Sequence, residues 1–314
     1  MILALAGGVG GAKLAHGLSM RLPAERLQIV ANTGDDFDHL GLHISPDVDT
    51  VMYWLAGVND RTRGWGLADE SWNFMAALEK LGGPGWFKLG DRDLATHIER
   101  TRRLNGGESL SQVTRFLCEH LGVHHLVAPM TDRPVRTIVH TNEGELEFQH
   151  YFVRRQCEPR VIRLEYKGAR EADPSPAFEA ALARDDLEAI VICPSNPMLS
   201  IEPILALRGV RAKIERQRAP VVAVSPIVGG QAIKGPAAKI LRELGHEPSA
   251  FEVARYYADL IDGIVIDEID AALRPTIEKL NMNVAVANTV MKSPDDQAKL
   301  ANDVIDFAAT LGRP

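Results

Sequence analysis

The opening stretch, Met1-Ile-Leu-Ala-Leu-Ala-Gly-Gly-Val-Gly-Gly-Ala-Lys13, decides the expected fold. An apolar run of strand length leads into four glycines and a lysine, and residues 13–21 then have the pattern of a helix. Glycines let backbone amides approach a phosphate closely, and a helix that starts there points its positive end at the anion. This order predicts a phosphate-binding turn after the first strand. The residues expected to contact the phosphate are Gly8, Gly10, Gly11 and Lys13.

The glycine turn matches neither common phosphate-binding template. Lys13 stands where the dinucleotide-binding fingerprint has its third glycine, and the GxxxxGK[ST] spacing with its following hydroxyl is missing. A tight strand-to-helix turn without a ligand is the alternative interpretation. Ligands of α/β proteins bind beyond the carboxyl ends of parallel strands, so a site at this turn is favoured.

Composition limits the classes of protein that the chain can belong to. Its 314 residues, 46% hydrophobic and 25% charged, suffice for one large domain or two closely joined ones. The net charge of -7, without a block of Lys or Arg, disfavours binding to nucleic acid. Cys118, Cys157 and Cys193 form no CxxC pair, so we expect reduced thiols rather than a zinc site.

The amino-terminal sequence disfavours export. Met1 begins the first strand directly, without a basic leader, and the sequence contains no apolar run of about 18 residues. We therefore expect a cytoplasmic protein that does not enter a membrane.

Strand-like and helix-like segments alternate at both ends of the chain. Residues 27–31 form a second strand, and a β-α-β start of this kind is nearly always right-handed with parallel strands. We expect an α/β fold with a Rossmann-like parallel sheet, helices on both faces and an inserted α+β lobe. Residues 1–56 and 175–314 would form the core, 57–174 the lobe, and 1–314 a single catalytic unit. Further strands are expected at 126–130, 136–141, 145–153, 189–193, 220–225, 263–267 and 283–287, and helices at 49–56, 69–82, 91–121, 204–218, 236–245 and 294–311.

Four predicted strand ends carry glycine-rich or polar turns. The carboxyl ends of parallel strands lie on one edge of a sheet, so these turns are expected to converge there. Asn196 lies between two prolines, and a rigid turn is the alternative explanation for it. The four turns are residues 7–13, 32–36, 194–197 and 225–230.

Carboxylates are concentrated in the first fifty residues, at Asp35, Asp36, Asp38, Asp47 and Asp49. Mg²⁺ prefers a few carboxylate oxygens together with ligand phosphates. Asp35 follows the second strand and Asp49 begins the next helix, so both are expected to approach the glycine turn as metal ligands. Capping of a helix amino terminus is the alternative role for Asp47 and Asp49.

The segment Lys88-Leu-Gly-Asp-Arg-Asp-Leu-Ala-Thr-His97 holds five ionisable side chains. We expect a loop at Gly90 that lies over the site, and a solvated helix start is the alternative. No Ser-His-Asp spacing is present, so a covalent enzyme intermediate is not indicated. Asp91 and His97 are candidates for a general base.

Several of these motifs together resemble the 2-phospho-L-lactate transferase family of coenzyme F(420) biosynthesis. They occur in the family's order, and the resemblance extends over nearly the whole chain. It is carried by residues 6–14, 32–36, 45–51, 88–97, 194–197 and 224–227.

The resemblance implies an activity and a set of binding residues. It implies transfer of a phospho-three-carbon acid from its guanosine diphosphate conjugate to the ribityl hydroxyl of the deazaflavin Fo, with Mg²⁺ as cofactor. Asp35 and Asp49 would be catalytic and hold the metal. The acceptor Fo would lie at Asp49 and Lys88, and the nucleotide at Asn32, Ser195 and Asn196.

The resemblance leaves three points open. The acid can be of the lactate, enolpyruvate or glycerate type. The family implies a homodimer. Two other functions remain as alternatives: an NAD(P)-dependent oxidoreductase that uses the same glycine turn, which Lys13 disfavours, and a non-catalytic nucleotide-binding regulator.

Overall fold

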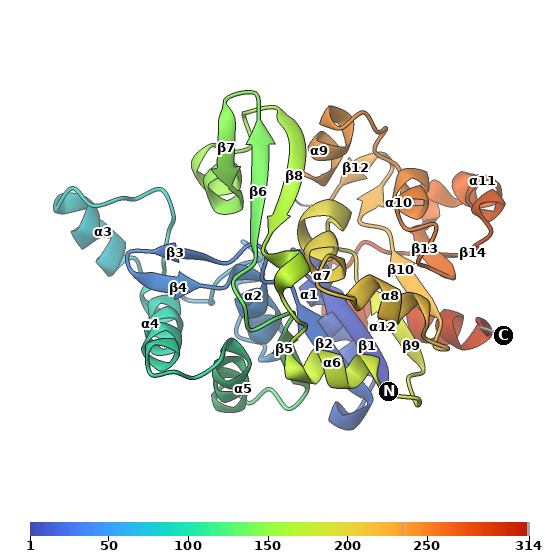
Figure 1. Ribbon diagram of the computed structural model, residues 1–314, viewed down its shortest axis with the longest axis horizontal. Coiled ribbons are helices and arrows are strands. Elements are labelled where there is room, and N and C mark those ends of the chain that lie inside the picture. Colours follow the sequence, from blue (N-terminus) through green and yellow to red (C-terminus); the bar gives the residue numbers. More distant parts are fainter. Residues whose placement is uncertain (234, 313–314) are drawn as a thin grey trace.

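The computed structural model describes residues 1–233 and 235–312, so the predicted core boundary at residue 314 lies outside the described residues. A central sheet has the strand order β14-β13-β10-β9-β1-β2-β5, and every neighbouring pair is parallel (Figure 1). The predicted Rossmann-like sheet is confirmed. Its strands are β1 (Ile2–Ala6), β2 (Leu27–Ala31), β5 (Leu126–Pro129), β9 (Ala189–Ile192), β10 (Val221–Val224), β13 (Gly263–Asp267) and β14 (Asn283–Ala287).

Helices cover both faces of the sheet because alternate strand residues point to opposite sides. Ile2, Ala4 and Ala6 of β1 pack in one core with α1, α2, α5 and α12, whereas Leu3 and Leu5 pack in a second core with α6 to α11. Within the described residues, no helix has the length and apolar character needed to span a membrane. The helices are α1 (Gly8–Ser19), α2 (Pro46–Leu55), α3 (Asn73–Lys80), α4 (Asp91–Asn105), α5 (Leu110–His120), α6 (Pro176–Leu182), α7 (Glu202–Leu205), α8 (Val210–Glu215), α9 (Ala237–Glu243), α10 (Ala250–Tyr256), α11 (Arg274–Ile277) and α12 (Pro294–Thr310).

Smaller sheets and α3 project from this core (Figure 1). β3 (Phe37–His39) and β4 (Leu42–Ile44) form an antiparallel hairpin, and β6, β7 and β8 form a separate antiparallel sheet. The predicted lobe boundary is wrong at one strand. β5 falls within 57–174, yet it pairs with β2 in the central sheet. The remaining strands are β6 (Arg136–Thr141), β7 (Gly144–Glu147), β8 (Val161–Lys167), β11 (Ile227–Val228) and β12 (Gln231–Ala232).

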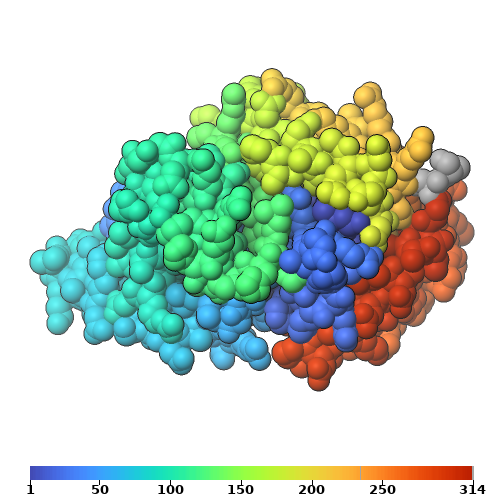
Figure 2. Space-filling model, turned by 90° about the horizontal axis from the view of Figure 1, so that it is seen from below, coloured from blue at the N-terminus to red at the C-terminus, as the bar shows by residue number. Residues whose placement is uncertain are grey.

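The strand order places a crevice beside β1. The chain runs from β1 to β2 and β5 on one side, and then crosses over to β9, β10, β13 and β14 on the other. The carboxyl ends of β1 and β9 therefore form the point at which the strand order reverses, where open α/β sheets bind ligands. The first residues of the chain, blue in Figure 2, lie beside the red carboxyl-terminal helix, and α1 packs against α12.

Candidate active site

A cavity of about 760 Å³ lies at this crevice, within the size range of small-molecule sites. It brings together the ends of β1 and β9, the start of α2, and residues of the lobe. Two of the predicted residues, Gly11 and Asn32, are absent from its lining, and they lie behind the cavity wall. The predicted residues that line it are Gly8, Gly10, Lys13, Asp35, Asp49, Lys88, His97, Ser195 and Asn196.

The glycine turn is part of a helix rather than a loop before it. α1 begins at Gly8, five residues earlier than predicted, and so contains Gly10 and Gly11. A Cβ atom at Gly10 would lie 2.2 Å from the Pro194 carbonyl oxygen, and one at Gly11 would lie 2.5 Å from Ser195 Oγ. These glycines are therefore required for close packing of α1 against the turn after β9.

The first amides of α1 already have partners in the structure. Gly7 N donates to Ser195 Oγ at 3.1 Å, and Gly8 N donates to Asp47 Oδ1 at 2.7 Å. Val9 and Gly10 follow in the same first turn, whose N–H groups precede the intrahelical hydrogen bonds, and both line the cavity. The positive end of α1 thus faces the cavity, with Ser195 and Asp47 holding its first two amides.

Asn196 has the turn-forming role that the sequence left as an alternative. Its side-chain oxygen accepts hydrogen bonds from Met198 N and Leu199 N, which fixes the turn after β9. Lys13 is also held by the protein, because its Nζ donates to the Met291 carbonyl at 2.7 Å. This bond joins α1 to the segment after β14, and both Lys13 and Met291 line the cavity.

Asp35 and Asp47 form a pair of buried carboxyl groups on the cavity wall. Asn32 Nδ2 donates to Asp47 Oδ2 at 2.9 Å, so Asn32 supports the pair from behind. Burial raises the pKa of Asp35 well above its usual range, and the charge of Asp47 adds to the effect. Burial likewise raises the pKa of Asp47 to about 6, although hydrogen bonds from Asn32 and Gly8 oppose the change. Asp35 Oδ1 is buried and has no hydrogen-bond partner among the described residues.

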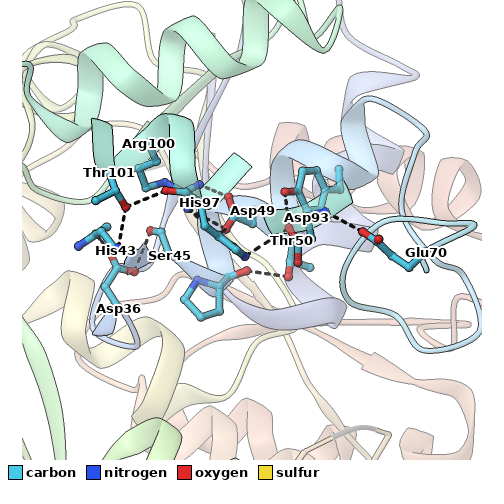
Figure 3. A network of polar contacts seen from close by, with 12 residues as sticks. Asp36, His43, Ser45, Asp49, Thr50, Glu70, Asp93, His97, Arg100 and Thr101 are labelled. Carbon is cyan, nitrogen blue, oxygen red and sulfur yellow. Dashed lines mark hydrogen bonds and ion pairs between the residues drawn. The ribbon is translucent and has the colours of Figure 1, made fainter. Parts of the chain in front are cut away.

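Asp49 is held differently, in the network of Figure 3. Arg100 Nη1 donates to Asp49 Oδ2 at 3.1 Å, and Arg100 Nη2 donates to Asp49 Oδ1. Arg100 is 0% exposed and comes from α4, so a buried ion pair joins the helix of the lobe to α2. Burial raises the pKa of Asp49, and the charge of Arg100 limits the rise.

His97 and Asp93 extend this network along α4, and both line the cavity. His97 Nδ1 lies 3.2 Å from Arg100 Nη1, and since an arginine only donates, this ring nitrogen is the acceptor. The same nitrogen lies 3.7 Å from Asp49 Oδ2, and the other ring nitrogen, Nε2, lies 3.5 Å from Asp93 Oδ1. Asp93 also accepts a hydrogen bond from Tyr53 Oη at 2.6 Å, and its backbone N–H donates to Glu70 at 2.7 Å.

Asp91, a predicted base candidate, is a structural residue. It accepts hydrogen bonds from Ser71 Oγ, from Phe74 N, and from both the backbone and side-chain nitrogens of Asn73. These bonds lower the pKa of Asp91 to about 2 and fix the start of α3. Asp91 is not among the residues that line the cavity. The proposal of Asp91 as a base is therefore wrong.

Aromatic side chains that the sequence analysis did not single out line another part of the cavity. Trp86 and Phe87 immediately precede Lys88, and their rings pack edge to face. Phe148 and Phe152 stack with ring centroids 5.4 Å apart. Trp65 is 43% exposed and joins them in the cavity lining. The position of Trp86-Phe87 beside the charged segment 88–97 was the one signal in the sequence that could have indicated this wall.

The model of one protein family, 2-phospho-L-lactate transferase CofD, matches residues 2–303. The chain belongs to this family. The family assignment makes it a transferase, in agreement with the sequence prediction.

Named relatives cover almost the whole chain. It is 37% identical to the 2-phospho-L-lactate transferase of Methanosarcina acetivorans, over 99% of this chain and 100% of the relative. It is 39% identical to the phosphoenolpyruvate transferase of Streptomyces griseus, over 98% of both proteins.

A solved structure shows the same fold. The crystal structure of a UPF0052 family member from Bacillus halodurans has a TM-score of 0.63 and covers 97% of this chain and 98% of its own. The sequence identity of 13% is low, so this likeness concerns the fold alone.

Proposed function

We propose that the protein transfers a phosphorylated three-carbon acid from its guanosine diphosphate conjugate to the terminal ribityl hydroxyl of the deazaflavin Fo, forming F(420)-0 or dehydro-F(420)-0. The hydroxyl oxygen attacks the phosphorus that carries the acid, the bond from this phosphorus to the bridging oxygen breaks, and GMP leaves. Phosphoryl transfer of this kind depends on positioning and electrostatics, without a protein nucleophile. The names of the relatives from Methanosarcina and Streptomyces support the proposal.

The observation that carries the proposal is the composition of the cavity at the ends of β1 and β9. The amino terminus of α1 would supply an anion-binding end at Val9 and Gly10, which follow the amides held by Ser195 and Asp47, beside buried carboxyl groups. Elsewhere the same cavity has aromatic walls, which suit the flat ring system of a deazaflavin. A phosphorylated donor and an aromatic acceptor would therefore meet in one space.

The residues have separate roles in this proposal. Gly8, Gly10, Lys13, Ser195 and Asn196 would contact the nucleotide and its phosphates. Gly11 and Asn32 would support that surface from behind, because neither lines the cavity. Lys88, exposed beside the aromatic wall, would contact the acceptor together with Asp49.

The charges of the cavity are compatible with Mg²⁺. Asp35, Asp47, Asp49 and Asp93 line it, and a diphosphate would add further negative charge. Asp35 Oδ1, buried without a partner in the described chain, is a suitable metal ligand. An ionised carboxylate has about four acceptor positions, so Asp49 can bind a cation while it is paired with Arg100.

Asp35 and Asp49 would therefore hold the ion. Within residues 1–233 and 235–312, no three His, Cys, Asp or Glu side chains are grouped as a complete metal site. This fits Mg²⁺, which is usually bound by one or two carboxylates and the phosphates of the substrate. When bound, the ion would offset the charge that develops on the phosphoryl oxygens and on GMP.

The test is a transfer assay with purified protein, Fo, Mg²⁺ and each of three guanylylated acids: lactate, enolpyruvate and glycerate. Relatives with the two names are almost equally similar to this chain, so all three acids are needed. We expect GMP release and a new phosphodiester, both detected by mass spectrometry, with at least one donor. Omission of Fo is the control, and no GMP should then form.

Folded protein that releases no GMP with any donor would contradict the proposal. A thermal-shift comparison adds a binding measurement that needs no turnover. GDP should stabilise the protein and NAD should not, whereas the dinucleotide-dependent alternative requires the reverse.

The homodimer implied by the resemblance and a cytoplasmic location are part of the same proposal. Light scattering coupled to size exclusion measures the first, because a dimer has twice the chain mass of 34.4 kDa. Fractionation of the source cells measures the second.

A further inference from the structure

Asp49 is a cavity carboxylate whose orientation is fixed by a single charged side chain. Both of its oxygens accept N–H groups of one guanidinium, that of Arg100. A two-point contact of this kind fixes the plane of the carboxylate as well as its position. By contrast, Asp35 in the same cavity has a buried oxygen with no partner in the described chain.

Burying the guanidinium of Arg100 is energetically unfavourable for the fold, which indicates that it has a role. Arg100 is fully buried, and its Nε has no hydrogen-bond partner among the described residues. Removing a guanidinium from water is expensive unless its partners compensate. A well-packed apolar side chain would join α2 and α4 as well. The buried arginine therefore indicates a requirement for a fixed charge beside Asp49.

The rest of the network holds Arg100 in place. His97, one turn earlier on α4, accepts from Arg100 Nη1, and its other ring nitrogen faces Asp93 (Figure 3). The next residue of the helix, Thr101, accepts a hydrogen bond from His43 N of β4 at 2.8 Å. Contacts on both sides thus fix the segment of α4 that presents Arg100 to Asp49.

We propose that Arg100 is a positioning residue for the transfer reaction: it orients the Asp49 carboxylate toward the acceptor hydroxyl. The proposal rests on the function proposed above. Arg100 does not line the cavity, so it acts through Asp49 and does not touch the substrates. His97 completes the arrangement by accepting from the same guanidinium.

The test is a double-mutant cycle with Arg100→Lys and Asp49→Asn. Lysine keeps the positive charge but lacks the planar fork that holds both oxygens. A small misplacement of a reacting group can cost about 100-fold in rate, so Arg100→Lys should lower kcat by about 10- to 100-fold with the KM for the donor unchanged. In the Asp49→Asn background the same change should have no further effect, because the carboxylate on which Arg100 acts is gone.

Fluorescence of the deazaflavin gives a second readout that needs no turnover. The Kd of Fo should rise in Arg100→Lys, and the two substitutions should again be non-additive. Binding of GDP should stay as in the wild type.

Arg103→Lys is the matched control, since Arg103 lies on the same helix and is ion-paired with Glu99 and Glu108 away from the cavity. It should leave kcat and the Kd of Fo unchanged.

The outcomes separate the two proposals. The positioning role would be overturned if Arg100→Lys kept the wild-type kcat. It would also be overturned if Arg100→Lys lowered kcat equally in proteins with Asp49 and with Asn at this position. In both cases the transferase function would stand. A wild type that neither binds Fo nor releases GMP would overturn the proposed function, and the positioning role with it.

Discussion

The cavity contains two pairs of buried carboxyl groups that differ in how the protein balances their charge. Asp49 and Asp93 lie in a network with Arg100, His97 and Tyr53. Among the described residues, Asp35 and Asp47 form no hydrogen bond or ion pair with a cationic side chain; their neighbours are Asn32, Gly8 and each other.

The two pairs of carboxyl groups also differ in their pKa values. For Asp93, the effect of burial is outweighed by hydrogen bonds from His97 and Tyr53, and its pKa is lowered. For Asp49, burial raises the pKa, and the charge of Arg100 limits the rise. For Asp35 and Asp47, burial prevails and raises both pKa values. Strongly perturbed carboxyl groups in a cleft are typical of functional sites. Arg100 and His97 therefore offset part of the charge of Asp49 and Asp93, whereas the charge of Asp35 and Asp47 is offset less, which is why we propose that the ion binds at Asp35 together with Asp49.

Among the variants that distinguish the two pairs, Asp35→Asn should have the largest effect on kcat. If Asp35 holds Mg²⁺, its loss should reduce kcat by about 1,000-fold, equivalent to about 4 kcal/mol. The variant should at the same time be more stable than the wild type without Mg²⁺ at pH 8, because a buried, under-neutralised charge is removed. GMP release and thermal unfolding with and without Mg²⁺ measure both effects.

Asp93→Asn, from the other pair, is the matched control. It should lower the midpoint of thermal unfolding, since Asp93 is well partnered, but leave the Mg²⁺-induced shift in place. A Mg²⁺-induced shift that survives in Asp35→Asn and disappears in Asp93→Asn would reverse the roles of the two pairs.

A smaller effect should appear in the pH dependence of stability. The folded-state pKa of Asp47 is about 6, above the ordinary value of 3.8, so the native state keeps a proton that the unfolded chain has released between these values. Stability without metal should therefore fall as the pH rises from about 4 to 6, by up to about 3 kcal/mol from this group. Asp35 shifts in the same direction.

Mg²⁺ should reverse this loss, because a cation binds the ionised carboxylates in competition with protons. The rise in unfolding midpoint on adding Mg²⁺ should thus be larger at pH 8 than at pH 5. NaCl of matched ionic strength is the control. Equal Mg²⁺ shifts at both pH values would show that the ion does not bind at Asp35.

The sequence predicted the parallel sheet and much of the cavity because both depend on local patterns. Apolar runs mark the strands, and the polar turns that follow them lie at one edge of the sheet. The start of α1 was missed because glycine is a poor helix former, and only the close approach of Pro194 explains Gly10 in a helix. Arg100 was missed because its partner, Asp49, is 51 residues away in the chain.

Asp91 was misinterpreted for a similar reason, and it provides the smallest of the expected effects. Its partners Ser71, Asn73 and Phe74 lie in a segment that the sequence does not place beside it. Asp91→Asn should therefore change kcat by less than about twofold, whereas a general base contributes about 100-fold or more. The unfolding midpoint should fall slightly, because an amide cannot accept all the hydrogen bonds that the carboxylate accepts.

The acidity of Asp91 sets the pH range of this difference in stability. Its folded-state pKa is lowered to about 2, so the stabilisation is complete above the ordinary value of 3.8 and is lost as the pH falls through about 2. The difference in stability is measured by thermal unfolding of Asp91→Asn and the wild type at pH 7 and at a pH near 2. The effect on activity is measured by kcat at pH 7. A loss of kcat near 100-fold at unchanged stability would contradict the structural role and restore Asp91 as a candidate general base.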